Sequence, residues 1–321
     1  MLLNRRFLQF IFICWFCLTS IFVQKVFGQT NAQELKIVQL SDIHYDSILI
    51  NIGSRMYGES RELFQAAIND INSLKNLDAI VSSGDNINRP SKKDLFNFLK
   101  TSKQLKIPFY ITIGNHDVGL LGNSSKRFYI NALKKYYPYI KPEGKNTYYI
   151  TDNIKGYKFI FLDGVIDGEI SAHGLFPKEQ LVWLDNKLKA NENYKIIIVQ
   201  HHPVVPPFEG GTHDVVNSDE YLEIIDKHNN VVAVLSGHYH CVKAIIRNNV
   251  LHASAPSLVQ YPNAYRLMTF KDEDNCTLIT SEFRETALKD VQNTSKERIF
   301  RNLDIYSGEK EDQSFTYKLC K

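Results

Sequence analysis

Short apolar runs alternate with stretches of helical periodicity through most of this chain. The runs are rich in Ile, Val, Leu and Phe and are bounded by polar or glycine-containing segments, so each predicts a buried strand. These predicted strands cover residues 35–40, 78–82, 109–113, 157–162, 196–199 and 231–235. Between them, apolar positions recur at helical spacing and predict helices over 60–74, 92–104, 177–189 and 218–228. Ser60 is the expected N-cap of the first helix, and Pro177 is suited to the first turn of the third.

The part of the chain from 242 to 283 has a different pattern, with one strand-like run after another. Turns are predicted at Asn248-Asn249 and over 272–275, as expected for antiparallel pairing. Alternating strands and helices followed by this strand-rich part predict one layered α/β domain over residues 35–283. The remaining residues, 284–321, are charged and irregular. We expect them to form either a short peripheral appendage or a mobile tail.

The N-terminus has the pattern of a secretory signal peptide. Arg5 and Arg6 precede an apolar stretch over 7–23, and small residues follow at 26–28. This order predicts a signal peptide over residues 1–28, cleaved after Gly28. The alternative is an uncleaved membrane anchor, although polar residues interrupt the apolar stretch that such an anchor needs. Either way we expect a secreted or periplasmic protein, with membrane contact only if the segment is not cleaved.

Composition narrows the class of protein and the kind of partner. With 321 residues, 44% of them hydrophobic and 23% charged, the chain is typical of a globular protein with a sizeable core. A net charge of +3 is too small to predict binding to a nucleic-acid duplex. Three cysteines follow the predicted signal, namely Cys241, Cys276 and Cys320, so at most one disulfide can form. Their spacing matches no zinc motif, and we expect each to be unpaired or partly buried.

Aspartate and histidine side chains gather directly after five of the predicted strands. The five clusters are Asp42-Ile43-His44, Gly84-Asp85, Gly114-Asn115-His116-Asp117, His201-His202 and Gly237-His238-Tyr239-His240. In an open α/β sheet, ligands bind beyond the carboxyl ends of the strands, so all five clusters are expected to meet at one edge. Any one cluster is a weak signal, because such short motifs arise by chance. Five in order, each after a strand, predict one site.

The spacing and residue types within the clusters are suited to metal binding. In an extended chain, residues i and i+2 point the same way, so Asp42 with His44, and His238 with His240, can each direct two ligands to one place. Carboxylate oxygen and neutral imidazole nitrogen are ligands for Zn, Mn or Fe. His202 is expected to point away from its neighbour His201, and either a role near the site or a packing role remains open for it.

In this order and spacing, the five clusters strongly resemble those of the calcineurin-like metallophosphoesterases. The resemblance covers residues 35–283 and implies a four-layer α/β/β/α sandwich, with a dinuclear metal site at the carboxyl-terminal edge of the strands. It implies that one metal is held by Asp42, His44, Asp85 and His240. It implies that Asp85 bridges to a second metal, which is completed by Asn115, His201 and His238. It also implies that His116 contacts the substrate phosphate or leaving group and that Asp117 orients His116.

Finer features resemble the class III cyclic nucleotide phosphodiesterases within that superfamily. The similar stretches are 113–117, 175–184, and the part from 201–203 to 236–238. Purple acid phosphatases have a tyrosine where this chain has Asn88, so no iron–tyrosinate chromophore is expected. The resemblance implies a small phosphoester substrate, such as a nucleotide, a glycerophosphodiester or a lipid head group.

The chemistry of such a centre favours phosphodiesters. Two divalent or mixed-valence ions of Mn, Fe or Zn activate a bridging hydroxide, which attacks phosphorus in line with the leaving oxygen. Two divalent ions bring four positive charges, and Asp42, Asp85 and hydroxide remove three, so the remaining charge matches a diester monoanion. A phosphomonoesterase or a pyrophosphohydrolase on the same centre is the first alternative. A non-catalytic binding module is the second, and it is disfavoured because every expected ligand position is filled.

Overall fold

The computed structural model describes residues 33–208, 211–300 and 303–320. The predicted signal peptide, residues 1–28, lies outside this part of the chain. No helix within the described residues is long and apolar enough to cross a membrane.

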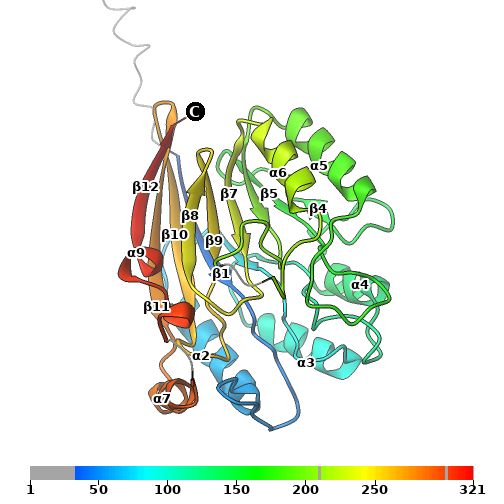
Figure 1. Ribbon diagram of the computed structural model, residues 1–321, viewed down its shortest axis with the longest axis vertical. Coiled ribbons are helices and arrows are strands. Elements are labelled where there is room, and N and C mark those ends of the chain that lie inside the picture. The colour runs from blue at the N-terminus through cyan, green and yellow to red at the C-terminus, as the bar shows by residue number, and fades with distance from the viewer. Residues whose placement is uncertain (1–32, 209–210, 301–302, 321) are drawn as a thin grey trace, which may run out of the picture. The chain divides into compact units, whose positions relative to one another are not determined.

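Two six-stranded sheets form the framework (Figure 1). The first has the order β12-β11-β10-β1-β2-β3, in which β1, β2 and β3 are parallel and the other neighbours are antiparallel. The second has the order β4-β5-β6-β7-β9-β8, with parallel pairing from β5 to β9 and antiparallel strands at both edges. The strands of the first sheet are β1 (Glu34–Leu40), β2 (Ala79–Ser82), β3 (Phe109–Ile111), β10 (Ala264–Glu273), β11 (Cys276–Glu285) and β12 (Phe315–Cys320). Those of the second are β4 (Tyr149–Ile150), β5 (Tyr157–Phe161), β6 (Lys195–Val199), β7 (Val231–Ser236), β8 (Lys243–Arg247) and β9 (Val250–Ser254).

Alternate side chains of the second sheet enter two different hydrophobic cores. Phe159 and Phe161 of β5 pack in the core shared with the first sheet, whereas Ile160 packs in a core with helices α5 (Lys178–Ala190) and α6 (Ser218–Asp226). This alternation follows from the two-residue period of a strand. It places the two sheets face to face, with α5 and α6 covering the second sheet (Figure 1).

Three further helices pack against the first sheet. They are α2 (Ser60–Ile71), α3 (Lys92–Ser102) and α4 (Lys126–Tyr136), and their apolar faces belong to the same core as the strands of that sheet. The predicted four-layer α/β/β/α sandwich is confirmed. The predicted cap of the first helix is wrong, because Ser60 lies inside α2 and its hydroxyl accepts the N–H of Asp46 (3.0 Å). A single 3₁₀ turn, Tyr57–Glu59, leads into this helix instead.

The C-terminal part completes the first sheet, which excludes one of its two expected forms and corrects the expectation for two cysteines. After α7 (Lys289–Glu297), α8 (Leu303–Ser307) and α9 (Lys310–Gln313), β12 pairs with β11 as an edge strand, so this part is not a mobile tail. The antiparallel register sets Cys276 opposite Cys320, and the two form a disulfide. The expectation of unpaired cysteines is therefore wrong for these two, because their pairing depends on a register that the chain pattern does not reveal. Cys241 is free and buried.

We predict that the Cys276→Ser/Cys320→Ser double variant loses about 2–4 kcal/mol of unfolding free energy, because the disulfide closes a long loop and restricts the unfolded chain. Denaturant unfolding of the mature protein measures this change. Wild-type protein unfolded in the presence of a reductant is the matched control and is expected to show the same midpoint as the variant. A midpoint unchanged from the oxidised wild type would show that β12 is held by its backbone pairing alone.

Candidate metal centre

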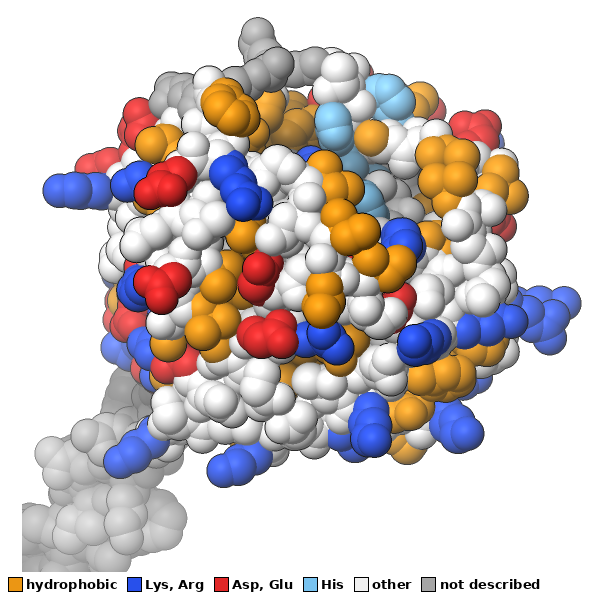
Figure 2. All heavy atoms as spheres, turned by 90° about the horizontal axis from the view of Figure 1, so that it is seen from below, with side chains coloured by type: hydrophobic (Ala, Val, Ile, Leu, Met, Phe, Trp, Pro, Cys, Tyr) orange, Lys and Arg blue, Asp and Glu red, His pale blue; other side chains and the backbone are white. Residues whose placement is uncertain are grey.

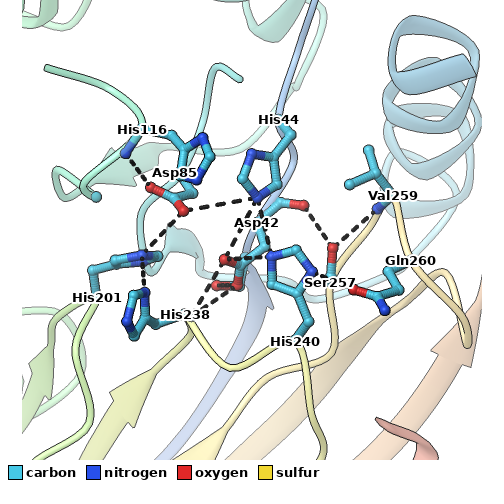
Figure 3. A network of polar contacts seen from close by, with 12 residues as sticks. Asp42, His44, Asp85, His116, His201, His238, His240, Ser257, Val259 and Gln260 are labelled. Carbon is cyan, nitrogen blue, oxygen red and sulfur yellow. Dashed lines mark hydrogen bonds and ion pairs between the residues drawn. The ribbon is translucent and has the colours of Figure 1, made fainter. Parts of the chain in front are cut away.

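The five predicted clusters lie together where strands of both sheets end (Figure 3). Backbone hydrogen bonds join their loops side by side. The N–H of Asp42 donates to the carbonyl of Gly84 (3.0 Å), and the N–H of His44 donates to that of Asp85 (2.9 Å). These bonds continue the parallel pairing of β1 with β2 into the loops. The prediction that distant clusters converge at one edge is confirmed.

The local backbone of the candidate ligands differs from the expected extended chain. Asp42, His44, Asp85, His238 and His240 all have positive φ, between 44° and 75°. Residues other than glycine rarely adopt this left-handed region, and they keep it only where the surrounding structure enforces it. The pairs converge because the chain turns sharply at each ligand. The expected extended chain at these pairs is therefore wrong, and turns bring Asp42 close to His44 and His238 close to His240.

Two glycines make room for carboxylates from neighbouring loops. A Cβ at Gly114 would lie 2.2 Å from Oδ1 of Asp85, and one at Gly237 would lie 2.6 Å from Oδ2 of Asp42. Both distances are far below van der Waals contact, so any side chain here would displace a candidate ligand. Glycine is required at both positions because a carboxylate from another loop occupies the space of the side chain. The spacing of residues in the sequence does not reveal this contact.

The candidate ligands form two groups. In the first, Nε2 of His240 lies 3.3 Å from Oδ1 of Asp42 and 3.0 Å from Nε2 of His44. In the second, Nε2 of His201 lies 3.1 Å from Nδ1 of His238. Each group therefore brings two imidazole nitrogens close to a common point.

Asp85 lies between these groups. Its Oδ2 is 3.2 Å from Nε2 of His201, in the second group, and 3.7 Å from Nε2 of His44, in the first. Asn115 belongs to the second group, because its Oδ1 is 3.1 Å from Nε2 of His201. The arrangement gives two adjacent ligand sets with one carboxylate common to both.

Hydrogen bonds outside the two groups determine which ring nitrogen of the second group's histidines faces the site. Nδ1 of His201 lies 2.9 Å from the carbonyl oxygen of Ser83, and Nε2 of His238 lies 2.7 Å from that of Ala172. A carbonyl oxygen can only accept, so both of these nitrogens carry protons. In the neutral rings, Nε2 of His201 and Nδ1 of His238 are then left with lone pairs, and it is these two atoms that face each other.

In the first group, the side chain of Gln260 orients the ring of His240. Oε1 of Gln260 lies 2.7 Å from Nδ1 of His240, while Nε2 of Gln260 donates to the hydroxyl of Ser54 (2.9 Å). Nδ1 of His240 is therefore the donor, and its Nε2 presents a lone pair to the carboxylate of Asp42. Outer hydrogen bonds of this kind orient metal-binding histidines.

Facing lone pairs repel each other unless a positive charge lies between them. The carboxylates of the site favour positive charge as well: burial would lower the pKa of His201, yet Asp85 and Asp42 raise it to about 9. The pKa of Asp85 is held well below its usual range, because His201 and His116 outweigh the effect of burial. This donor set of buried nitrogen and oxygen atoms fits divalent metal ions of the Zn, Mn or Fe type.

His116 and Asp117 have different positions beside the metal groups. The ring of His116 is half-buried, and its Nδ1 donates to the carbonyl oxygen of Asn88 (2.8 Å). Asp117 is fully buried and accepts from the N–H groups of Asn86, Ile87 and Gly114 and from the Asn86 side chain. Burial and the charge of Asp85 raise the pKa of Asp117 to about 7, against the effect of these hydrogen bonds.

The expected role of Asp117 is thus corrected. Both of its oxygens are bound to the loop that carries Asp85 and to Gly114, so it shapes that loop, and the carbonyl of Asn88 orients His116. A carboxylate bound by several backbone N–H groups is a typical device for fixing a tight loop.

His202 lies at the edge of the second group. It is fully buried, its ring centroid is 4.5 Å from that of His238, and a Cβ at Gly174 would lie 2.7 Å from its own Cβ. Within the described residues neither of its ring nitrogens has a hydrogen-bond partner. Burial and the neighbouring His201 lower its pKa well below the usual value, so the ring is neutral.

Sequence reasoning missed the residues that orient the ligands and His116. They are Ser83, Asn88, Ala172 and Gln260. Three of the four act through backbone carbonyls, which leave no side-chain signature in a sequence. The fourth, Gln260, follows a strand like the ligands do, but a lone glutamine carries no motif.

Comparisons with known proteins agree with this geometry. The family model described as "Calcineurin-like phosphoesterase" matches residues 35–242. The chain belongs to this family. A probable cyclic nucleotide phosphodiesterase of Xenorhabdus bovienii is 27% identical over 236 residues, which are 70% of this chain and 86% of that protein. A probable glycerophosphodiester phosphodiesterase of Arcobacter nitrofigilis is 28% identical over 232 residues, which are 69% of this chain and 78% of that protein.

A solved structure shares the fold. The dimetal phosphatase from Danio rerio aligns over 90% of this chain and 99% of its own, with a TM-score of 0.63 and 15% identity. The family and the fold together identify the chain as a phosphoric ester hydrolase that uses divalent metal ions. The predictions of fold, enzyme class and metal-dependent phosphoester hydrolysis are confirmed.

We predict that Asp85→Asn reduces metal binding at both positions, because one carboxylate serves two ligand sets. Metal content per chain, measured by inductively coupled plasma mass spectrometry after reconstitution, is expected to fall well below that of the wild type. Asp152→Asn, a change at an exposed aspartate remote from these groups, is the matched control and is expected to keep full metal content. Loss of only one ion in Asp85→Asn would contradict the shared position.

Proposed function

We propose that this protein is a dinuclear-metal phosphodiesterase that hydrolyses small phosphodiesters outside the cytoplasm. The observation that carries the proposal is the pair of adjacent ligand sets with Asp85 between them. Asp42, His44, Asp85 and His240 would hold one ion. Asp85, Asn115, His201 and His238 would hold the other.

Two bound metal ions supply an activated water and positive charge for the phosphoryl oxygens. The contribution of the chain is to direct lone pairs of His201, His238 and His240 inward and to limit the carboxylates of the ligand sets to Asp42 and Asp85. With a hydroxide included, two divalent ions leave one net positive charge. That charge matches a phosphodiester monoanion, which supports a diester as the preferred substrate.

His116 is suited to protonate the leaving oxygen. The carbonyl of Asn88 holds a proton on Nδ1, so Nε2 is the atom that can give or take a proton at the site. The ring centroid lies 4.7 Å from that of His44, which places His116 beside the first ligand set. In the reaction, water and a phosphodiester give a phosphomonoester and an alcohol, and the proton that the alcohol needs comes from Nε2 of His116.

The names of relatives support the choice of substrate class. The X. bovienii and A. nitrofigilis proteins are described as probable phosphodiesterases of cyclic nucleotides and of glycerophosphodiesters. Both substrates are small phosphodiesters. The metal identity that we propose is any of Mn, Fe or Zn, since the same nitrogen and oxygen ligands serve all three.

Export is supported by the disulfide. Disulfides persist in oxidising compartments such as the periplasm or the extracellular space, and Cys276 and Cys320 are paired. A signal-like pattern over residues 1–28 agrees with this location. We therefore propose that the mature enzyme is secreted or periplasmic.

His116→Ala is expected to lower kcat by about 10²–10⁴, because a positioned general acid contributes that much. The loss is expected to be larger for methyl phenyl phosphate than for bis-p-nitrophenyl phosphate, whose nitrophenolate leaves without needing a proton. Steady-state kinetics with both substrates measures the difference, and metal content is expected to stay near that of the wild type.

The matched control is His228→Ala, which removes a histidine that pairs with Asp185 away from the metal groups. It is expected to leave kcat for both substrates unchanged. An equal loss on both substrates in His116→Ala would remove it as the general acid and leave it only a binding role.

A second test concerns the choice between diester and monoester. We predict that the metal-loaded enzyme hydrolyses bis-p-nitrophenyl phosphate with a kcat/KM at least about ten-fold above that for p-nitrophenyl phosphate, a difference of about 1.4 kcal/mol. The ratio is measured after stripping the metals and adding back Mn, Zn or Fe singly. A faster reaction with the monoester under every metal would support the phosphomonoesterase alternative.

A further inference from the structure

A cavity of about 230 Å³ opens beside the catalytic histidine. Asn115 and His116 connect this cavity with the metal groups, and Val118 and Val165 add apolar surface to its lining. Figure 2, which views the molecule from below, shows histidine side chains in a hollow with hydrophobic side chains gathered beside them. The cavity is therefore continuous with the place where the leaving oxygen receives its proton.

Large aliphatic side chains from two loops surround the opening of this cavity. Leu120 and Leu121 follow β3, and Ile170 follows β5, and all three line the cavity. They are 65%, 73% and 68% exposed. A single exposed leucine is ordinary, but several that converge on one cavity next to a reaction centre are typical of a surface that binds apolar groups. We call Leu120, Leu121 and Ile170 the apolar rim.

The charged groups at the cavity do not favour an anion. Arg89 lies in the lining, but its guanidinium is paired with the carboxylate of Asp46 (2.8 Å). Glu169 also lines the cavity and adds a negative charge next to Ile170. Apart from His116, which acts at the reacting oxygen, the described residues that line the cavity supply no unpaired cation, so a leaving group with its own negative charge, such as a further phosphate, would meet the carboxylate of Glu169.

We propose that this cavity binds the leaving alcohol of the substrate, and that this alcohol is uncharged and apolar, with an alkyl or aryl body. The proposal rests on the phosphodiesterase function above and specifies its substrate class. In the reaction the oxygen of water bonds to phosphorus, and the bond from phosphorus to the alcohol oxygen breaks with its electron pair. His116 gives that oxygen its proton, and the free alcohol leaves through the apolar rim. Acylglycerols of lipids and soluble aryl or alkyl alcohols share this chemistry.

The test uses the metal-loaded mature protein and methyl 4-alkylphenyl phosphates, in which the alkyl group grows from methyl to octyl. The phenols released have nearly the same acidity, so chemical reactivity stays constant while the apolar surface grows. Because burying a methylene is worth about 0.8 kcal/mol, kcat/KM is expected to rise by up to about four-fold per methylene until the cavity is filled.

Two rim variants and one control decide whether the cavity causes this rise. For each variant, kcat/KM of every ester is divided by kcat/KM of the methyl ester. Leu121→Asp and Ile170→Asp are each expected to reduce the rise of this ratio with alkyl chain length. Val182→Asp places the same charge on an apolar residue that is 53% exposed on α5, away from the cavity, and is expected to keep the wild-type dependence. Metal content and circular dichroism verify that each variant is folded.

A second pair of substrates tests whether the cavity disfavours a negatively charged leaving group. The 4-propylphenyl ester and its 4-(2-carboxyethyl)phenyl analogue have similar size, and the charged one is expected to react at least ten-fold more slowly. Glu169→Gln is expected to reduce this ratio, whereas Glu192→Gln, at an exposed site after α5, is expected to leave it unchanged. A ratio near one in the wild type would contradict the exclusion of anionic leaving groups.

Vesicles of phosphatidylglycerol distinguish the source of the alcohol. Release of diacylglycerol would show that the cavity takes lipid from a membrane surface, and a chain-length dependence with soluble esters alone would show that it takes dissolved substrates. A flat dependence in the wild type, or the same rise in both rim variants, would overturn the proposal. If bis-p-nitrophenyl phosphate is still hydrolysed in that case, only this inference fails; if no diester is hydrolysed with any metal, the phosphodiesterase function itself fails.

Discussion

The repulsion among buried lone pairs is the constraint on which this site depends. Nitrogens of His201 and His238 face each other at 3.1 Å, and those of His44 and His240 at 3.0 Å, with carboxylates of Asp42 and Asp85 beside them. Outer hydrogen bonds leave lone pairs on Nε2 of His201, Nδ1 of His238 and Nε2 of His240, so positive charge inside the array stabilises it. The site therefore favours cations, and cations there would neutralise phosphoryl oxygens.

Holding such an array requires a rigid surrounding structure. The left-handed backbone at Asp42, Asp85 and His240 costs free energy, which the packed sandwich must offset. The parallel strands supply the rigidity, because their loops remain hydrogen-bonded to one another beyond the sheet. Gly114 and Gly237 then allow the loops to approach closely enough for carboxylates from different strands to reach the same point. The fold thus positions the ligands, and carbonyls such as that of Ser83 set the direction of each ring.

Much of the fold and nearly all of the candidate ligands could be predicted from the sequence. Apolar runs that form buried strands, and the position of Asp85 or His201 directly after them, are local patterns, and their convergence follows from parallel topology. Features that depend on long-range register could not be predicted. The Cys276–Cys320 pair needs the pairing of β11 with β12, and the binding of Asp117 to the Asp85 loop needs the loop conformation itself. The apolar rim could not be predicted from the sequence either, because Leu121 and Ile170 are far apart in the chain and come together only around the cavity.

The most direct test of the central claim is the number and position of bound metals. Crystals of the mature protein reconstituted with Mn or Zn allow each ion to be located by anomalous diffraction at its absorption edge. The account predicts two ions per chain that share the carboxylate of Asp85, with Nδ1 of His238 and Nε2 of His201 as ligands of the same ion. A single ion, or two ions without Asp85 between them, would contradict it.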